Sequence, residues 1–188
     1  MHLRGVVPLS HFFLRERVKE GDRVVDATCG NGNDTLLLAR LVGPAGRVWA
    51  FDLQEKAIEA TRELLALHGV LDRVELVRAG HERLAELVGE PLRAAVFNLG
   101  YLPGGDKGLI TRPETTLPAL GAVLDLLLPG GLLVVAVYTG HPGARVEDEA
   151  VCAWAAALDP RLFNVWTSRQ PNRPETSPYL VLVETGRP

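Results

Sequence analysis

Short apolar runs alternate along the chain with longer segments of helical periodicity. The runs predict buried strands, whereas apolar residues spaced three or four apart predict helices. The pattern predicts strands at 24–26, 47–51, 74–77, 94–97, 132–138, 162–167 and 179–184, and helices at 12–20, 35–41, 55–68, 81–88, 116–128 and 145–158. This alternation is typical of an α/β fold, in which helices cover both faces of a mostly parallel sheet.

The last two predicted strands have no helix between them. The segment 168–178 that connects them has 11 residues, and three of these are prolines. A parallel return usually needs a dozen or more residues, so we expect this pair to be antiparallel. At the start of the helix predicted at 116–128, Thr115 or Thr116 can serve as the N-cap. The 188 residues contain no repeat or composition break, which predicts a single domain over residues 1–188.

Composition and charge are those of an ordinary globular protein. The chain is 47% hydrophobic and 23% charged, and its net charge of −3 argues against non-specific coating of nucleic acid. Its two cysteines, Cys29 and Cys152, cannot form a disulfide framework or supply a zinc site alone, so we expect no metal and a reducing cytoplasm. The longest charge-free run, 126–144, is interrupted by prolines and glycines, so we expect no membrane partner.

The segment between the first predicted strand and the following helix has the features of a ligand-binding turn. Gly30 and Gly32 allow a tight turn and close approach of a ligand at the carboxyl end of the strand. A dinucleotide site would have a third glycine at the position of Thr35, which disfavours a nucleotide-binding oxidoreductase. Asp26 suits the positively charged end of a ligand, and Asp52 suits two ribose hydroxyls. Together they indicate S-adenosylmethionine as the cofactor.

The residues 24–32 also resemble the first motif of class I S-adenosylmethionine-dependent methyltransferases, with Thr28 in place of the first glycine of that motif. The resemblance implies a Rossmann-like fold with a seven-stranded sheet of order 3-2-1-4-5-7-6, and a loop after the third strand that contacts adenine. We therefore expect the cofactor to be bound by residues of these turns and loops: Asp26, Gly30, Asn31, Gly32, Asn33, Asp52, Gln54, Gly80, His81 and Asn98.

The fourth predicted strand ends in a segment that points to methylation of nitrogen. Asn98, followed three residues later by Tyr101, resembles the Asn-Pro-Pro-Tyr motif of amino-group methyltransferases, with Leu99 and Gly100 in place of the prolines. An asparagine side-chain oxygen can accept a hydrogen bond from an amine and direct its lone pair at the methyl group. Tyr101 can stack on a planar base. We expect both residues to be catalytic.

Four segments, 26–35, 51–54, 98–107 and 138–143, together resemble one small bacterial family described as rRNA methylases. That family is associated with methylation of 5-aminomethyl-2-thiouridine at the tRNA wobble position, which implies an RNA substrate. An alkylammonium must lose a proton before its nitrogen can attack. His141, Asp106 and His81 are candidate proton acceptors, although Asp106 can equally pair with Lys107.

The segment 160–174 carries three arginines, Arg161, Arg169 and Arg173, and no acids. Arginines pair with phosphates, so we expect these three, together with Arg112, Asp106 and Lys107, to contact RNA in an anticodon stem-loop. A homodimer is left open by the sequence. So are three other functions: methylation of rRNA, methylation of a small-molecule amine, and a non-catalytic RNA-binding subunit.

Overall fold

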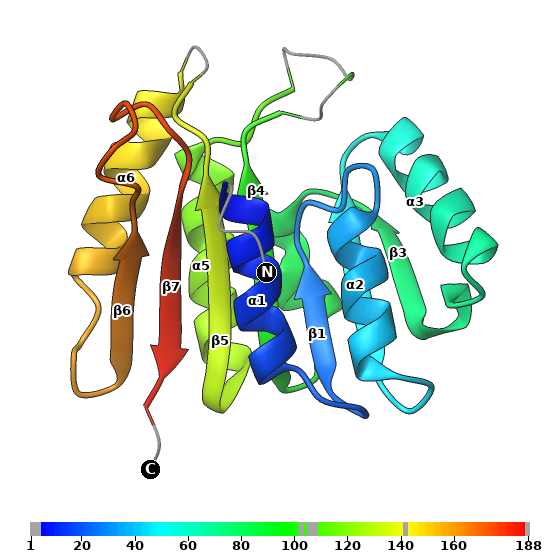
Figure 1. Ribbon diagram of the computed structural model, residues 1–188. Helices are drawn as coiled ribbons and strands as arrows, with labels where there is room; N and C mark the ends of the chain where they lie inside the picture. Colours follow the sequence, from blue (N-terminus) through cyan, green and yellow to red (C-terminus); the bar gives the residue numbers. More distant parts are fainter. Residues whose placement is uncertain (1–4, 102–103, 105–108, 141–142, 187–188) are drawn as a thin grey trace.

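The computed structural model describes residues 5–101, 104, 109–140 and 143–186 and contains one seven-stranded sheet (Figure 1). The strand order is β3-β2-β1-β4-β5-β7-β6. β7 is antiparallel to β5 and β6, and the other pairs are parallel, which confirms the predicted order and the predicted hairpin. The strands are β1 (Arg23–Asp26), β2 (Arg47–Asp52), β3 (Val74–Arg78), β4 (Leu92–Leu99), β5 (Leu127–Val137), β6 (Phe163–Ser168) and β7 (Tyr179–Thr185).

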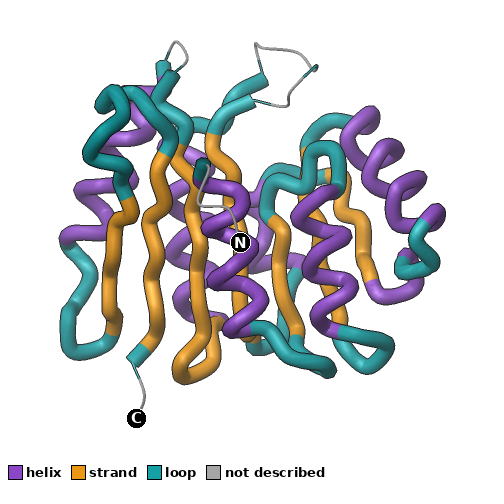
Figure 2. The backbone as a smooth tube through the Cα atoms, in the orientation of Figure 1, coloured by secondary structure: helices purple, strands orange, loops and turns teal. Residues whose placement is uncertain are grey.

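Helices cover both faces of the sheet, as the purple and orange segments of Figure 2 show. They are α1 (Val6–Arg17), α2 (Asn33–Val42), α3 (Glu55–Leu67), α4 (Leu84–Leu87), α5 (Pro113–Leu126) and α6 (Ala144–Ala156), with 3₁₀ turns at η1 (Leu71–Arg73) and η2 (His81–Arg83). Val24 packs into the core beside α1 and α2, while its neighbour Val25 packs into the core beside α5. Burial on both faces explains why the strands read as nearly continuous apolar runs.

The starts of α1 and α5 differ from the predicted positions. α1 begins at Val6, earlier than the predicted residue 12, and a proline in the first turn, Pro8, is compatible with a helix. The predicted cap at Thr115 or Thr116 is wrong, because α5 begins at Pro113 and no side chain caps it. The Thr116 hydroxyl instead donates to the buried carboxylate of Glu147 at 2.7 Å. Proline is favoured in this position because its fixed φ suits the first helical turn.

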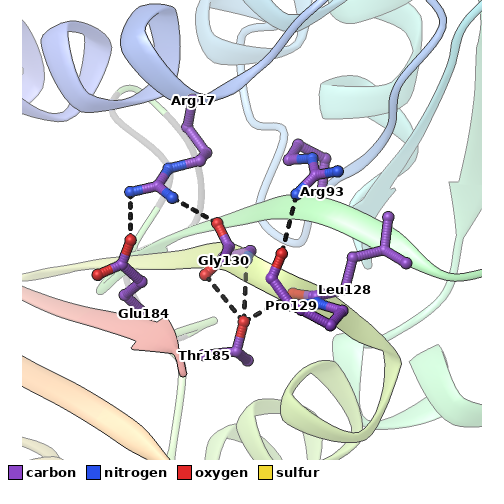
Figure 3. Close-up of polar contacts among 8 residues, drawn as sticks. Arg17, Arg93, Leu128, Pro129, Gly130, Glu184 and Thr185 are labelled. Atoms are coloured by element: carbon purple, nitrogen blue, oxygen red, sulfur yellow. Dashed lines mark hydrogen bonds and ion pairs between the residues drawn. The ribbon is translucent and has the colours of Figure 1, made fainter. Parts of the chain in front are cut away.

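The amino-terminal helix is fixed to the edge of the sheet opposite the carboxyl ends of the parallel strands (Figure 3). At the end of α1, the Arg17 guanidinium donates to the Gly130 carbonyl at 2.5 Å and to the Glu184 carboxylate at 2.6 Å. The Thr185 hydroxyl donates to the Leu128 carbonyl at 2.6 Å. The Arg17 bonds join the end of α1 to β5 and β7, and the Thr185 bond joins these two strands to each other, so the last turn of α1 is fixed at this edge.

Within the charge-free run at 126–144, the strand β5 covers Leu127–Val137, so it begins earlier than the predicted residue 132. Within the described ranges, no helix combines the length and the apolar character that crossing a membrane requires. The cysteines Cys29 and Cys152 are both free thiols.

Candidate active site

A cavity of about 950 Å³ lies at the carboxyl ends of the parallel strands. Its wall includes the segments 27–31, 52–54, 79–82 and 98–101, which follow or end β1, β2, β3 and β4. Val7 of α1 also lines it. Ligands of open parallel sheets bind at this edge, near the point where the strand order reverses. Among the described residues, no group of three or more His, Cys, Asp or Glu side chains is arranged to hold a metal ion.

The turn after β1 is hydrogen-bonded to the strands on both sides. The Ala27 amide donates to the Val96 carbonyl of β4 at 2.9 Å, and the Cys29 amide donates to the Phe51 carbonyl of β2 at 2.8 Å. The Thr28 hydroxyl accepts a hydrogen bond from the backbone amide of Asn98 at 2.7 Å. Gly32 has a φ of 81°, and a Cβ there would lie 3.0 Å from Thr61. The positive φ therefore favours glycine at this position, and a larger residue would also crowd Thr61.

Asp52 lies at the end of β2 and lines the cavity. Its carboxylate accepts the Gly30 amide at 3.1 Å and the Gln54 amide at 2.9 Å, one on each oxygen. Burial raises the pKa of Asp52, and these backbone hydrogen bonds oppose the rise. Each oxygen keeps a further lone pair. The carboxylate can therefore accept hydrogen bonds from two ribose hydroxyls while it holds the two turns together.

His81 begins the 3₁₀ turn after β3 and is only 7% exposed. Its ring meets Phe97 edge to face, with the centroids 5.6 Å apart. Burial lowers the pKa of His81, which favours the neutral ring. Within the described part of the chain, its Nε2 is buried and has no hydrogen-bond partner. A buried polar atom without a partner at the wall of a cavity is suited to meet a polar ligand atom, such as a nitrogen of adenine.

Asp26 does not have the position that the sequence suggested. It is fully buried and does not line the cavity. Its carboxylate accepts the Thr35 hydroxyl at 2.6 Å and the Thr28 amide at 3.2 Å. Burial, and then the charge of Asp34, raise its pKa to about 7. Asp26 therefore shapes the turn from inside, and the expected direct contact with a ligand ammonium is not available to it.

Asp34, which sequence reasoning missed, lines the cavity instead. It lies in the first turn of α2, and its Oδ2 accepts the Asn98 side-chain amide at 2.7 Å. Its Oδ1 lies 2.5 Å from Nε2 of His11 on α1. The sequence could have indicated Asp34, because it is an acid in the first turn of the helix after the glycines, where a side chain points back toward the cavity. Asn98 is thus held in the cavity by two neighbours, through its backbone to Thr28 and through its side chain to Asp34.

The base of the loop after β4 is held by a buried carboxylate. The Gly100 amide donates to the Thr111 hydroxyl at 2.8 Å, and this hydroxyl donates to Glu147 of α6 at 2.6 Å. Tyr101 lines the cavity, is 40% exposed and pairs with Ile110 in an isolated antiparallel bridge. Thr111 and Glu147 carry no motif that the sequence could have revealed. The predicted residues Asp106, Lys107 and His141 lie outside the described residues.

The structure separates the arginines that the sequence grouped together. Arg112 lines the cavity at the start of α5. Arg169 follows β6 and lies 3.5 Å above the Tyr179 ring, at the carboxyl edge. Arg173 is exposed in the connection to β7. Arg161 precedes β6, so it lies at the opposite edge and pairs there with Asp159 at 2.6 Å. The expectation that Arg161 shares a surface with the other arginines is therefore wrong.

The remaining predicted cofactor residues come together at the cavity. Gly30, Asn31, Asn33, Gln54 and Gly80 all line it, whereas Gly32, the N-cap of α2, belongs to the same turn but does not line the cavity. Different residues suit different parts of S-adenosylmethionine: Asp52 suits the ribose, and the unpartnered His81 nitrogen suits the base. The cavity has ample volume for a nucleoside and an amino acid.

We expect Asp52→Ala to weaken binding of S-adenosylhomocysteine by about 10- to 150-fold, the 1.5–3 kcal/mol scale of a charge-assisted hydrogen bond. Titration calorimetry measures this change. Glu55→Ala is the matched control, because Glu55 is an exposed acid three residues later that does not line the cavity. Equal affinities for the parent and the Asp52 variant would contradict a ribose-binding role.

Comparison with known proteins shows the family to which the chain belongs. Residues 48–184 match the family model described as "Putative rRNA methylase". The chain is 42% identical over 185 residues to "tRNA (mnm(5)s(2)U34)-methyltransferase, chloroplastic" of Arabidopsis thaliana, covering 93% of this chain and 67% of that protein. It is 30% identical over 119 residues to a probable cobalt-precorrin-6B C(15)-methyltransferase of Saccharolobus solfataricus, of whose length it spans 54%.

Two solved structures are similar over nearly their full length. A "putative rRNA-methylase" from Clostridium thermocellum superposes with a TM-score of 0.95 at 42% identity, covering 98% of this chain and all of that chain. A "putative methyltransferase" from Streptococcus mutans in complex with SAH superposes with a TM-score of 0.89 at 40% identity, covering 98% of this chain and 99% of that one. The fold is that of the class I methyltransferases, and the chain belongs to the family described as "Putative rRNA methylase".

Proposed function

We propose that this protein transfers a methyl group from S-adenosylmethionine to the aminomethyl nitrogen of 5-aminomethyl-2-thiouridine at the tRNA wobble position, with residues 1–188 acting as one domain. The observation that carries the proposal is the position of Asn98, held by Asp34 in the same cavity as Asp52. The 42% identity to a chloroplast wobble-uridine methyltransferase supports the choice of substrate.

Bound S-adenosylmethionine supplies a methyl group on a positively charged sulfur. Asp52 would hold its ribose, Gly30 and Gln54 would keep the Asp52 carboxylate oriented, and His81 would meet its base. The floor of the site is the turn of residues 27–31, whose bonds to β2 and β4 keep it rigid. Rigid placement of both reactants is worth several kcal/mol in a bimolecular transfer, because it removes the entropy cost of bringing them together.

Asn98 would orient the methyl acceptor. Its side-chain NH₂ donates to Asp34, which leaves Oδ1 on the other side of the amide, free to accept an N–H of the substrate amine. The neutral amine then directs its lone pair at the methyl carbon. The new N–C bond forms as the C–S bond breaks, the bonding electrons stay on sulfur, and the ammonium product releases one proton.

RNA would approach over the rim of the cavity. Arg112 and Tyr101 line the cavity, and Arg169 and Arg173 lie at the same edge of the sheet. Arginine pairs with phosphates and tyrosine stacks on an unpaired base, as the nucleotides of an anticodon stem-loop require. A cytoplasmic location and the open possibility of a homodimer remain predictions from the sequence. The chloroplast location belongs to the plant relative.

The direct test uses purified protein, S-adenosylmethionine and tRNA that carries 5-aminomethyl-2-thiouridine. Nucleoside mass spectrometry should show loss of that nucleoside and gain of 5-methylaminomethyl-2-thiouridine. Methylation of rRNA or of a small amine, with this tRNA unchanged, would favour those alternatives. Binding of tRNA with no methyl transfer to any of the three would favour a non-catalytic role.

We expect Asn98→Ala to lower kcat by about 100-fold or more, with little change in substrate affinity, because the amide acts on the amine in the transition state. Asn98→Asp should lower kcat comparably, because the new carboxylate would lie about as close to the Asp34 carboxylate as the Asn98 amide now does, at 2.7 Å, and the two like charges would repel. Steady-state assays measure both variants. Asn164→Ala, on the exposed edge strand β6, is the control. A folded Asn98→Ala enzyme with parental kcat would rule out this role for the amide.

The arginine positions generate a prediction for RNA binding. The double variant Arg169→Ala/Arg173→Ala should raise KM for tRNA and flatten its salt dependence, by roughly one in the log–log slope for each phosphate that no longer pairs with an arginine. Arg161→Ala should behave like the parent, because Arg161 lies at the opposite edge. Kinetics between about 50 and 200 mM salt make the comparison, with binding of S-adenosylhomocysteine as a check on folding. A slope altered equally by Arg161→Ala would place the RNA elsewhere.

A further inference from the structure

We propose that His11, on the amino-terminal helix, is a positioning residue of the methyl transfer. Acting through Asp34, it fixes the side-chain amide of Asn98 so that Oδ1 faces the substrate amine. The inference rests on the function proposed for Asn98 and deepens it, because it adds a residue outside the methyltransferase motifs.

The three side chains form a continuous chain of hydrogen bonds. His11 Nε2 lies 2.5 Å from Asp34 Oδ1, and Asn98 Nδ2 lies 2.7 Å from Asp34 Oδ2. A carboxylate can only accept, so both neighbours must donate to it. His11 therefore carries a proton on Nε2, and Asn98 turns its NH₂ toward Asp34. An asparagine amide has two orientations related by a flip, and this contact selects the one with Oδ1 turned away from Asp34.

The setting makes the contact between His11 and Asp34 consequential. Their side chains are only 19% and 12% exposed, so solvent screens the pair weakly. The charge of Asp34 also acts on two other groups, the buried carboxyl of Asp26 on β1 and the hydroxyl of Tyr138 after β5. The hydrogen bond from α1 holds the Asp34 carboxylate in the rotamer that Asn98 requires.

The fold fixes where His11 can be. α1 is held at its last turn by Arg17, whose bonds reach Gly130 and Glu184, and Leu14 packs completely buried in the core. Val7, one helical turn before His11, lines the cavity. The helix therefore runs from the opposite edge of the sheet to the wall of the site, where His11 meets Asp34.

The test compares three variants. His11→Ala should lower kcat at least 10-fold, while KM for tRNA and the affinity for S-adenosylhomocysteine stay within about 2-fold of the parent. His11→Gln should restore most of kcat, because its side-chain N–H can reach the place of Nε2. His68→Ala is the control, because His68 lies on the exposed end of α3 beside Arg40, away from the cavity.

A second measurement is independent of turnover. In NMR spectra, the side-chain amide of Asn98 should shift and exchange faster with water in His11→Ala, and should stay near its parental position in His11→Gln and His68→Ala. Parental kcat in His11→Ala, equal losses in the alanine and glutamine variants, or an unmoved Asn98 resonance would each overturn the proposal. A parent that does not methylate this tRNA would overturn the proposed function, and the NMR comparison would still decide whether His11 orients Asn98.

Discussion

The turn after β1 is hydrogen-bonded to the ends of both neighbouring strands, and the candidate site depends on this connection. Its backbone donates to Val96 on one side and to Phe51 on the other. Thr28 accepts a hydrogen bond from the backbone amide of Asn98, and Asp52 accepts one from the backbone amide of Gly30. The same turn therefore fixes both Asn98, proposed to orient the methyl acceptor, and Asp52, proposed to bind the ribose. A sheet whose order reverses at β1 brings these ends together, so the topology itself sets the distance between the two halves of the site.

Much of the fold could be predicted because its signals are local. Continuous apolar runs marked strands buried on both faces, and the short, proline-rich segment before Tyr179 marked the antiparallel return. The positions of Asp52 and Asn98 followed from the same reasoning, since a polar residue that ends a parallel strand must lie at the carboxyl edge. Their contact with a ligand stays a prediction, but their presence at one cavity is a property of the structure.

The rest required information that no short segment contains. Asp26 and Asp34 are both acids close to the glycine turn, but the first ends β1 and the second lies in the first turn of α2. Only the packing of this strand and this helix determines that Asp26 is buried and Asp34 lines the cavity. Arg161 and Arg169 are eight residues apart in the sequence, yet the strand β6 between them carries them to opposite edges. His11 approaches Asp34 because its helix packs into the core through Leu14 and is held at its far end by Arg17.

The burial of Asp26 makes the stability of the protein depend on pH. Folding raises the pKa of Asp26 from its ordinary value of 3.8 to about 7. Between these two pH values, Asp26 keeps its proton in the folded protein but has released it in the unfolded chain. Stability should therefore fall as pH rises through that interval and level off above it, where the carboxyl is ionised in both states. A positively charged ligand in the cavity would favour the ionised form. Ligand binding in the cavity and protonation of Asp26 are thus thermodynamically coupled, although Asp26 does not line the cavity.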